Sequence, residues 1–531
     1  MAHLGIDFGT TNTVAMIHDR GLFSAVLHEA QTAAGRIVQE VFPSAILVDH
    51  SSGRRWFGLE ADRRFAQVGP CSGYVFIPSL KRQLRNYAEG KTVSVAGSDD
   101  ASGAACSFDL ADLLTGFLTA LADSIRRSRS LDPDEPLETV MTWPANSNGA
   151  QRHITRKCFR RAGFEVIDTL NEPTASAIEM ADCLTAGRQR AGQAEPSAVA
   201  VFDLGGGTFD ASVVWINGND FRVLASSGIE QLGGDDFDCV LLQMFLDRLR
   251  LSADQIGALT HHAMLRQARA QKETISTGAV RSLFLNPQDF GLQGRSVSIK
   301  VDDYFKRLRP MLSPAIDMLG DVIRSAASIE RAITDGPSLT IYLVGGSSKL
   351  PLVADMVAKA FPKSRVVLTD KPFCSVAMGA AICATDRVTY RDVFARHFGL
   401  IRLRDHGRLE TFDTIFPAGT PIPRKGEPPL ERVAWYHPWH NVGHLRYLEC
   451  SSIGPNGLPA SDVRAWSDIL FPYDPACPLS ASLAPTDIVP TDHFARDAVC
   501  EVYRCDCDGV ITVELRRPSR NDSRCYEIYQ D

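Results

Sequence analysis

Two segments far apart in the chain combine the residue types that hold a phosphate chain and a metal. GIDFGTTNT supplies Asp7, Gly9, Thr10, Thr11 and Asn12, and FDLGGGTFD supplies Asp203, Gly205, Gly206, Gly207, Thr208 and Asp210. Glycine-rich turns let backbone N–H groups approach phosphate oxygens closely. Mg²⁺ beside phosphates usually keeps several waters and one or two carboxylates. Either segment alone is more often a simple turn, but two facing turns could clamp a polyphosphate, with Asp7 and Asp203 organising the metal.

Each segment lies between two apolar stretches, which predicts a pair of strands joined by a tight turn. In LGIDFGTTNTVAMI and in AVAVFDLGGGTFDASVVWI, an Asp ends the incoming strand and a Gly-Thr turn follows. The shared pattern predicts two related halves rather than a short-period repeat.

Helices and strands alternate around these two turns. Leu113, Leu114, Phe117, Leu118, Leu121 and Ile125 fall at helical spacing. ETVMTWP predicts a strand, QRHITRKCFRRAG a helix ended by Gly163, and NEPTASAIEMADCL a helix capped by Asn171. Further helices are predicted within 237–277 and 316–333, a surface loop at 187–197, and a strand, turn and helix in LTIYLVGGSSKLPLVADMVAKAF. This alternation predicts an α/β architecture with helices packed on sheets.

The composition changes after about Thr385. Long helical patterns give way to short alternating runs such as FGLIRLRD, LRYLECSS and GVITVELRR, which favour strands. A separate β-rich domain is therefore predicted at the C-terminal end.

Five motifs in a fixed order carry a resemblance to a known family. GIDFGTTNT, NEPTASAIEMA, VFDLGGGTFD, LGGDDFD and LVGGSSKLP resemble the phosphate, connecting and adenosine motifs of the 70-kilodalton heat-shock chaperones, within the actin–hexokinase superfamily. The resemblance covers Met1 to about Asp386. It implies an actin-like ATPase domain at 1–386, built from two ribonuclease H-like halves around a cleft. It also implies a linker at 387–392 and, more weakly, a peptide-binding β-sandwich at 393–531.

The resemblance also implies roles for single residues. Lys81 matches the lysine that positions the attacking water, and Glu172 the glutamate beside it; Pro144 and Arg152 match a switch pair. The implied phosphate contacts are Thr10, Thr11 and Thr208, with Asp203 and Asp210 in the catalytic set. Gly233 and Gly234 match a turn beside the phosphates and ribose, and the implied adenosine contacts are Lys272, Ser276, Gly345, Gly346 and Ser347. Simpler interpretations are a solvated Lys81, a first-turn helix carboxylate at Glu172 and an Asp210 that only closes its hairpin.

Three features depart from the family pattern. Arg269 and Glu273 in RAQKETIST, and Phe373 and Cys374 in PFCSVAMGAA, replace residues expected around adenine, so altered adenine contacts are predicted. The linker reads VTYR instead of a leucine run, so coupling would need another contact. No helical lid follows the β-domain, and bound peptide is therefore expected to dissociate faster.

Two clusters in the C-terminal part allow more than one interpretation. Trp435, Tyr436, His437, Trp439, His440 and His444 suggest either packing between strands, which is favoured, or a loop that anchors a partner or holds zinc. Cys500, Cys505, Cys507 and Cys525 suggest zinc less well than buried thiols, with Cys505 and Cys507 on one strand face.

Bulk properties limit the function classes. The chain has 531 residues and a net charge of -7, which gives no electrostatic reason to expect nucleic acid or an anionic membrane. The N-terminus does not resemble a signal peptide, no apolar run is long enough to span a bilayer, and 13 scattered cysteines favour a reducing cytoplasm. The leading hypothesis is a chaperone-like ATPase that uses Mg-ATP to control polypeptide binding, assisted by co-chaperones and a nucleotide exchange factor. The alternative is a nucleotide-dependent regulator or scaffold with a dedicated partner and little turnover.

Overall fold

The computed structural model describes two compact units. The first comprises residues 1–84, 90–145 and 155–389, and the second comprises 85–89, 146–154 and 390–531. The description leaves out residues 1–2, 20, 33–34, 69–72, 87–91, 96–105, 130, 132–134, 145–146, 148, 189–196, 230, 277, 331–332, 334–338, 395, 405–408, 425, 451, 462, 492–497 and 529–531. Within the described residues, no helix is both long enough and apolar enough to cross a membrane.

The first unit contains a sheet in which the predicted N-terminal turn joins two central strands. Its strands are β1 (His3–Phe8), β2 (Asn12–Asp19), β3 (Leu22–Ala25), β6 (Val41–Pro43), β12 (Leu137–Trp143) and β13 (Phe164–Asn171). Their order is β13-β12-β1-β2-β3, and β6 also pairs with β2. The first three run parallel, and β1, β2 and β3 alternate in direction.

A second sheet in the same unit repeats this plan. Five of its six strands are β14 (Ser197–Leu204), β15 (Phe209–Asn217), β16 (Asp220–Ile229), β19 (Leu339–Val344) and β20 (Arg365–Leu368), in the order β20-β19-β14-β15-β16. Again the first three strands are parallel and the last three alternate. The two predicted hairpins are therefore confirmed, and they occupy matching places in two sheets of like order.

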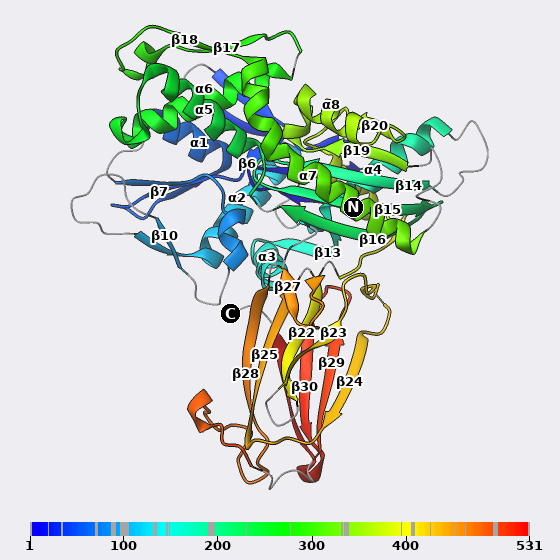
Figure 1. The fold of residues 1–531 in the computed structure, drawn as a ribbon. Coiled ribbons are helices and arrows are strands. Elements are labelled where there is room, and N and C mark those ends of the chain that lie inside the picture. Colours follow the sequence, from blue (N-terminus) through cyan, green and yellow to red (C-terminus); the bar gives the residue numbers. More distant parts are fainter. Residues whose placement is uncertain are drawn as a thin grey trace. The chain divides into compact units, whose positions relative to one another are not determined.

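Nine named helices accompany the sheets (Figure 1). They are α1 (Gly58–Val68), α2 (Leu110–Arg129), α3 (Gly149–Arg161), α4 (Glu172–Arg188), α5 (Gly234–Leu249), α6 (Ala258–Ile275), α7 (Val301–Ile329), α8 (Pro351–Ala360) and α9 (Ser375–Cys383) among the residues described. All six apolar residues predicted for the helix at α2 are buried. The loop predicted at 187–197 is shorter, because α4 includes Gly187 and Arg188 and β14 starts at Ser197; residues 189–196 lie outside the described part.

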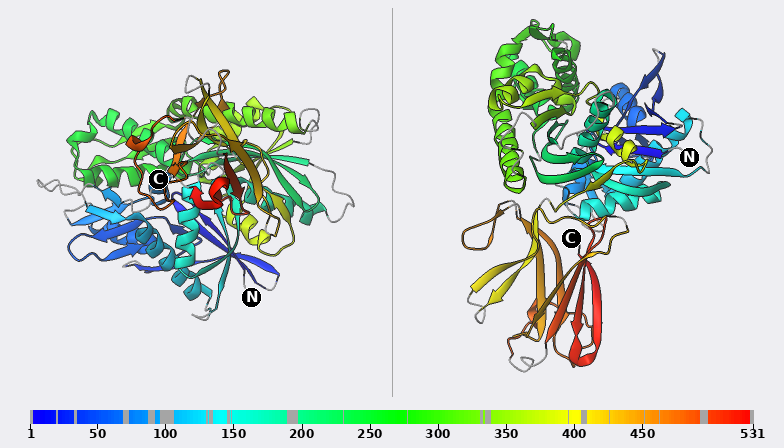
Figure 2. Two further views of the ribbon diagram at one scale, coloured as in Figure 1. Left: turned by 90° about the horizontal axis from the view of Figure 1, so that it is seen from below. Right: turned by 90° about the vertical axis from the view of Figure 1, so that its right-hand side faces the viewer.

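Helix α7 begins well before Ile316, the residue at which the sequence pattern predicted a helix to start. It starts at Val301 and contains Pro310 and Pro314. A buried stripe continues through both prolines, because Tyr304, Leu308, Leu312, Ala315 and Leu319 recur every three or four residues. Packing of this stripe on β15 and β16 offsets the hydrogen bonds that the prolines remove. Figure 2 shows this long helix along one side of the second sheet.

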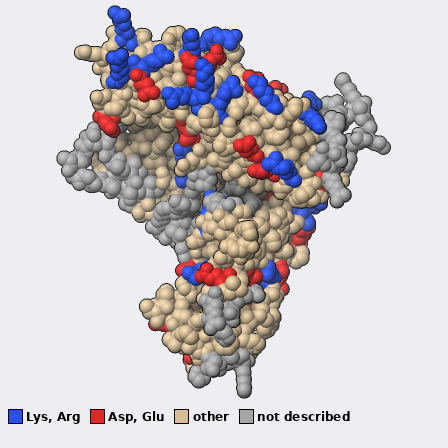
Figure 3. All heavy atoms as spheres, viewed as in Figure 1, with Lys and Arg blue, Asp and Glu red and all other residues tan. Residues whose placement is uncertain are grey.

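Smaller elements complete the first unit. They include the strands β4 (His28–Thr32), β5 (Gly35–Gln39), β7 (Ile46–Asp49), β8 (Arg55–Phe57), β9 (Tyr74–Ile77), β10 (Thr92–Val95), β11 (Cys106–Asp109), β17 (Ser282–Leu285) and β18 (Val297–Lys300). A 3₁₀ helix, η1 (Lys81–Asn86), follows β9 and places Lys81 at its start. On the face shown in Figure 3, Lys and Arg gather over the region of α5 and α6 with Asp and Glu among them.

Helices α4 and α9 cross closely enough that only glycine fits at Gly379. A Cβ atom on Gly379 would overlap the backbone carbonyl of Ala175. We expect Gly379→Ala to lower the free energy of unfolding of the first unit by about 2–3 kcal/mol, since backbone atoms cannot move aside as a side chain can. Urea unfolding followed by circular dichroism measures this loss. Gly257→Ala, where a Cβ meets open space, is the control and should cost under about 1 kcal/mol; equal losses would contradict the crossing.

The second unit consists mainly of two four-stranded antiparallel sheets, which confirms the predicted β-rich composition. One has the order β23-β22-β25-β28 and the other β24-β29-β30-β31. Their strands are β22 (His397–Arg404), β23 (Leu409–Phe416), β24 (Leu430–Tyr436), β25 (Val442–Cys450), β28 (Arg464–Pro472), β29 (Val499–Cys505), β30 (Ile511–Arg517) and β31 (Asp522–Ile528). Phe398 and Tyr447 of the first sheet and Tyr503 and Val513 of the second share one apolar core.

The cluster of aromatic and histidine residues at 435–444 lies partly on strands β24 and β25 and partly in the connection between them. Trp435 and Tyr436 lie on β24, so the less favoured alternative, a loop, is wrong for them. The Tyr436 hydroxyl donates a hydrogen bond to Glu501 and forms a second one with the Tyr473 hydroxyl, as packing between strands predicts. Trp435 and Trp439 are 62% and 50% exposed, so an anchoring role for these two stays a prediction.

The cysteine cluster does not share one strand face. Strand β29 ends at Cys505, and Cys507 lies in the following turn, where it is exposed while Cys505 is buried. The predicted alternation is therefore wrong, because a tight turn through Gly509 interrupts the strand. No group of three or more His, Cys, Asp or Glu side chains arranged to hold a metal occurs within the described residues.

Candidate functional site

The two glycine-rich turns touch each other. A Cβ atom on Gly206 would overlap the hydroxyl of Thr11, so the absence of a side chain allows the β14–β15 turn to meet the β1–β2 turn. Thr11 Oγ1 is buried and has no hydrogen-bond partner within the described residues. Ser44 supports the first turn by donating its hydroxyl to the Gly9 carbonyl at 2.8 Å. Thr10 and Asn12 belong to this turn, and Asn12 starts β2.

A third turn packs on the second. The N–H of Gly234 donates to Gly205 O at 3.0 Å, and the N–H of Asp235 donates to Gly206 O at 2.7 Å. A Cβ atom on Gly233 would lie 2.5 Å from backbone atoms of Gly206 and Gly207. The glycines predicted from two distant motifs therefore form one backbone surface.

The residues predicted to contact the nucleoside lie beside this glycine backbone surface. Ser347 donates its hydroxyl to Gly205 O at 2.8 Å, and Lys272 Nζ donates to Gly234 O at 2.6 Å. Gly345 adopts a φ of +83°, which favours glycine, and a Cβ there would overlap the Leu204 carbonyl. Gly346 contacts the ring of Phe373 closely. Ser276 is the exposed C-cap of α6, and its N–H donates to Glu273 O.

Lys81 and Glu172 form an ion pair inside the first unit. Lys81 Nζ lies 2.6 Å from Glu172 Oε1, and their side chains are only 11% and 9% exposed. Lys81 comes from the start of η1 and Glu172 from the first residue of α4. The interpretation of Lys81 as a solvated surface lysine is therefore wrong.

Buried carboxylates surround this ion pair. Burial, followed by the charge of Glu172, raises the pKa of Asp7 to about 8, while Lys81 lowers it. Burial, Glu172 and then Asp210 raise the pKa of Asp203 well above its ordinary value. Asp210, directly opposite Asp203 across the hairpin, is buried. Glu172, Asp7 and Asp203 thus share one lysine, and this concentration of carboxyl groups fits a divalent cation held through Asp7 and Asp203.

Asp7 is expected to make stability depend on pH. Its folded pKa of about 8 lies above its ordinary value of 3.8, so its stabilising contribution is present below pH 3.8 and is lost as pH rises through 8. Without divalent metal, the Asp7→Asn variant should gain stability relative to the unmodified protein as the pH rises. The difference in the free energy of unfolding should grow by up to about 1.4 kcal/mol for each pH unit between the two pKa values. Urea unfolding in EDTA from pH 5 to 8.5 measures the difference; a difference that does not change with pH would contradict the assignment.

Several site residues were missed by sequence analysis. Arg82 lies against Gly207, and its guanidinium is 3.0 Å from Asp235. Asp235 also pairs with Arg269, which in turn lies 3.0 Å from Asp238. The only sequence clues were the basic run KRQLR and the paired acids of LGGDDFD. Arg269, noted as a departure from the family pattern, links α6 to the start of α5.

The other departures differ in burial: Phe373 and Glu273 are exposed and Cys374 is buried. Phe373 is 44% exposed and carries Lys349 Nζ 5.0 Å above its ring. The Cys374 thiol is buried and donates to Glu40 at 3.6 Å, and burial raises its pKa to about 12. Desolvation of its carboxyl group also raises the pKa of Glu273. Of the implied switch pair, Pro144 follows β12, and Arg152 lies in α3 and donates to Ser147.

Comparisons with known proteins agree with this arrangement of motifs. Residues 118–393 match the family model described as "Hsp70 protein". Proteins named "Chaperone protein HscA homolog" from Burkholderia orbicola (strain MC0-3) and Burkholderia ambifaria (strain MC40-6) are each 30% identical over 385 residues, which is 72% of this chain. The aligned part spans 58% of the length of those relatives. The chain belongs to the Hsp70 family.

Proposed function

We propose that the first unit binds Mg-ATP between its glycine-rich turns and hydrolyses it. The observation that carries this proposal is the enclosed Lys81–Glu172 ion pair beside Asp7 and Asp203, since an enclosed lysine among carboxylates suits the control of one water at a phosphate. The backbone surface of Gly205–Gly207 and Gly233 would face the phosphates. Lys272 and Ser347 would lie on the nucleoside side, with Gly345, Gly346 and Ser276.

The proposed chemistry is in-line attack of water on the terminal phosphoryl group. Lys81 and Glu172 would hold the attacking water, and the hydroxyls of Thr10, Thr11 and Thr208 would contact phosphate oxygens. Bound Mg²⁺, organised by Asp7 and Asp203, would neutralise phosphate charge. Positioning and charge neutralisation supply most of the rate in such reactions, so no covalent nucleophile is required.

We also propose an actin-like duplicated fold for residues 1–386, followed by a linker at 387–392 and a β-sandwich at 393–531. The matching order and direction of strands in the two sheets support the duplication. Beyond β16, Thr389 donates its N–H to Asn219 O at 2.8 Å, which supports a linker that keeps a contact despite lacking leucines.

The second unit would bind an extended polypeptide under control of nucleotide state, in the cytoplasm. Membership of the Hsp70 family and the names of the relatives support this chaperone-like role, in which co-chaperones and an exchange factor would take part. The alternative is a nucleotide-dependent regulator or scaffold with one dedicated partner and little turnover.

A binding measurement separates the two roles. A library of unrelated apolar peptides and a set of native proteins are tested by fluorescence anisotropy with ADP and with ATP. Affinity for many peptides that changes at least about five-fold between nucleotides supports the chaperone-like role. Binding of one native partner, without general peptide affinity, supports the regulator.

A further inference from the structure

The first unit contains a cavity lined by residues outside the proposed nucleotide site. It has a volume of about 280 Å³ and is bounded by α4, α9, β19 and β20, with Phe23 from β3. A cavity of this volume has room for several waters or a small organic molecule.

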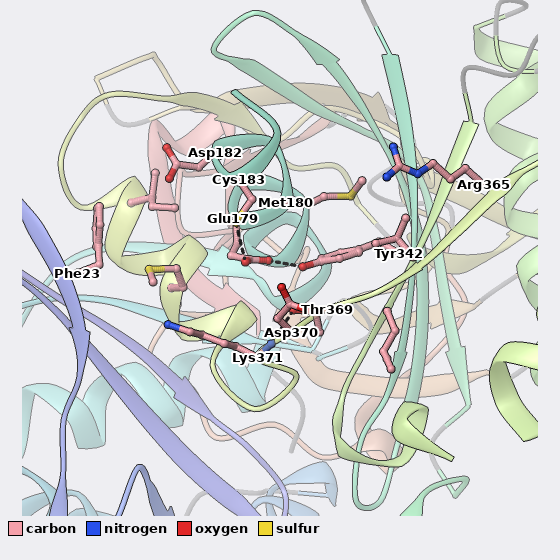
Figure 4. Close-up of a pocket in the computed structure, with 14 residues that line it drawn as sticks. Phe23, Glu179, Met180, Asp182, Cys183, Tyr342, Arg365, Thr369, Asp370 and Lys371 are labelled. Atoms are coloured by element: carbon pink, nitrogen blue, oxygen red, sulfur yellow. Dashed lines mark hydrogen bonds between the residues drawn. The ribbon is translucent and has the colours of Figure 1, made fainter. Parts of the chain in front are cut away.

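A buried carboxyl and a buried phenol form the polar centre of this cavity. Tyr342 donates its hydroxyl to Glu179 Oε2 at 2.6 Å, and the Cys183 thiol donates to Glu179 Oε1 at 3.3 Å. Glu179 is 7% exposed and Tyr342 is 4% exposed. These two donors and the Ser375 hydroxyl, which also lowers the pKa of Glu179 by hydrogen bonding, are uncharged, so they satisfy the carboxylate without a neutralising charge. Figure 4 shows the two side chains pointing toward each other.

The surroundings of Glu179 add negative charge. After burial, Asp182 is among the groups that raise the pKa of Glu179. Glu179, Asp182 and Asp370 together with burial raise the pKa of Cys183 to about 12. The cavity also includes Arg365 and Lys371, and Figure 4 shows them on opposite sides of the Glu179–Tyr342 pair. A positively charged ligand group beside Glu179 would offset the acidic charge there.

The remaining walls are apolar and partly deformable. Met180 and Met378 line the cavity from α4 and α9, and its other apolar lining residues are Phe23, Val367, Leu368 and Ile382. Thioether side chains adapt to irregular apolar bodies, and burying such a body contributes roughly 25 cal/mol per Å². The cavity therefore combines a set of apolar side chains with one buried carboxyl group, whereas the other charged side chains that line it are exposed.

We propose that this cavity binds a small organic cation, namely a protonated amine with a short apolar body, whose ammonium group donates to Glu179. The apolar body lies against Met180, Met378 and Leu368. The ammonium group adds a charged donor to a carboxylate whose donors Tyr342, Cys183 and Ser375 are uncharged, and charge-assisted hydrogen bonds are the stronger kind. This binding is separate from the proposed ATP binding and does not depend on it.

Three probes of nearly equal shape test the charge preference. Phenethylammonium, phenethyl alcohol and 3-phenylpropanoate carry a positive, a neutral and a negative end on the same apolar body. Saturation-transfer NMR on the full chain should rank phenethylammonium first, with an affinity at least about ten-fold above the other two. Preference for 3-phenylpropanoate would assign the site to Arg365 or Lys371 and overturn the proposal, and so would equal affinities or no binding at millimolar concentration.

Glu179→Gln locates the bound ammonium. It keeps the size of the side chain and should weaken phenethylammonium about ten-fold or more while leaving phenethyl alcohol within about two-fold. Asp355→Asn, at an exposed position of α8, removes one negative charge elsewhere and should change nothing. Lys81→Ala should also leave the amine affinity unchanged, so failure of the ATP proposal would not be mistaken for failure of this one. An unchanged affinity in folded Glu179→Gln overturns the assignment.

Discussion

Replacing Lys81 with alanine should reduce single-turnover hydrolysis of Mg-ATP by roughly 100- to 1,000-fold. The Lys81 ammonium lies 2.6 Å from Glu172 and is nearly enclosed, so little water can replace its charge. Its loss leaves Glu172, Asp7 and Asp203 without their shared lysine. The affinity for nucleotide should change only a few-fold, because the glycine turns that would hold the phosphates remain intact.

The matched control for this variant is Lys359→Ala. Lys359 is exposed on α8, and its removal should leave the hydrolysis rate within about two-fold. Rapid mixing with radiolabelled ATP, followed by quantification of ADP, measures both rates. Hydrolysis that is unchanged in Lys81→Ala, with the protein still folded, would contradict the assignment of Lys81 to the catalytic site.

The second large effect is expected at Gly233. A valine there should weaken Mg-ATP binding at least about 100-fold, equivalent to about 2.8 kcal/mol. Its Cβ would lie 2.5 Å from backbone atoms of Gly206 and Gly207, so the turn predicted to face the phosphates must move. Backbone atoms cannot rotate aside, in contrast to the end of a flexible side chain.

Isothermal titration calorimetry with Mg-ATP measures the effect at Gly233. Gly257→Val, placed at the start of α6 in open space, is the control and should bind normally. Gly233→Ala supplies a milder variant in case the valine disturbs folding, and it should still weaken binding about ten-fold. Normal affinity in folded Gly233→Val would show that the nucleotide lies elsewhere.

The elements that carry the site were predictable because their sequence cues are local. An Asp at the end of an apolar run, followed by glycines, identified both hairpins, and Asn171 before Glu172 and Pro173 identified the start of α4. The close approach of Lys81 to Glu172 followed from family resemblance and not from spacing, since 91 residues separate them.

The parts that could not be predicted depend on contacts between distant segments. Arg82 and Asp235 are 153 residues apart, and nothing near either residue identifies its partner. The first half of α7 was missed because Pro310 and Pro314 oppose helix formation locally, whereas packing on the second sheet favours it. The cavity at Glu179 likewise depends on α4, α9 and two strands coming together.

The most direct test of the central proposal is single-turnover hydrolysis of Mg-ATP by the unmodified protein in excess over nucleotide. Bound ATP should be converted to ADP and phosphate in a first-order phase that requires Mg²⁺. Tight binding of ATP with no conversion over hours would contradict ATP hydrolysis at this site and would favour the nucleotide-dependent regulator.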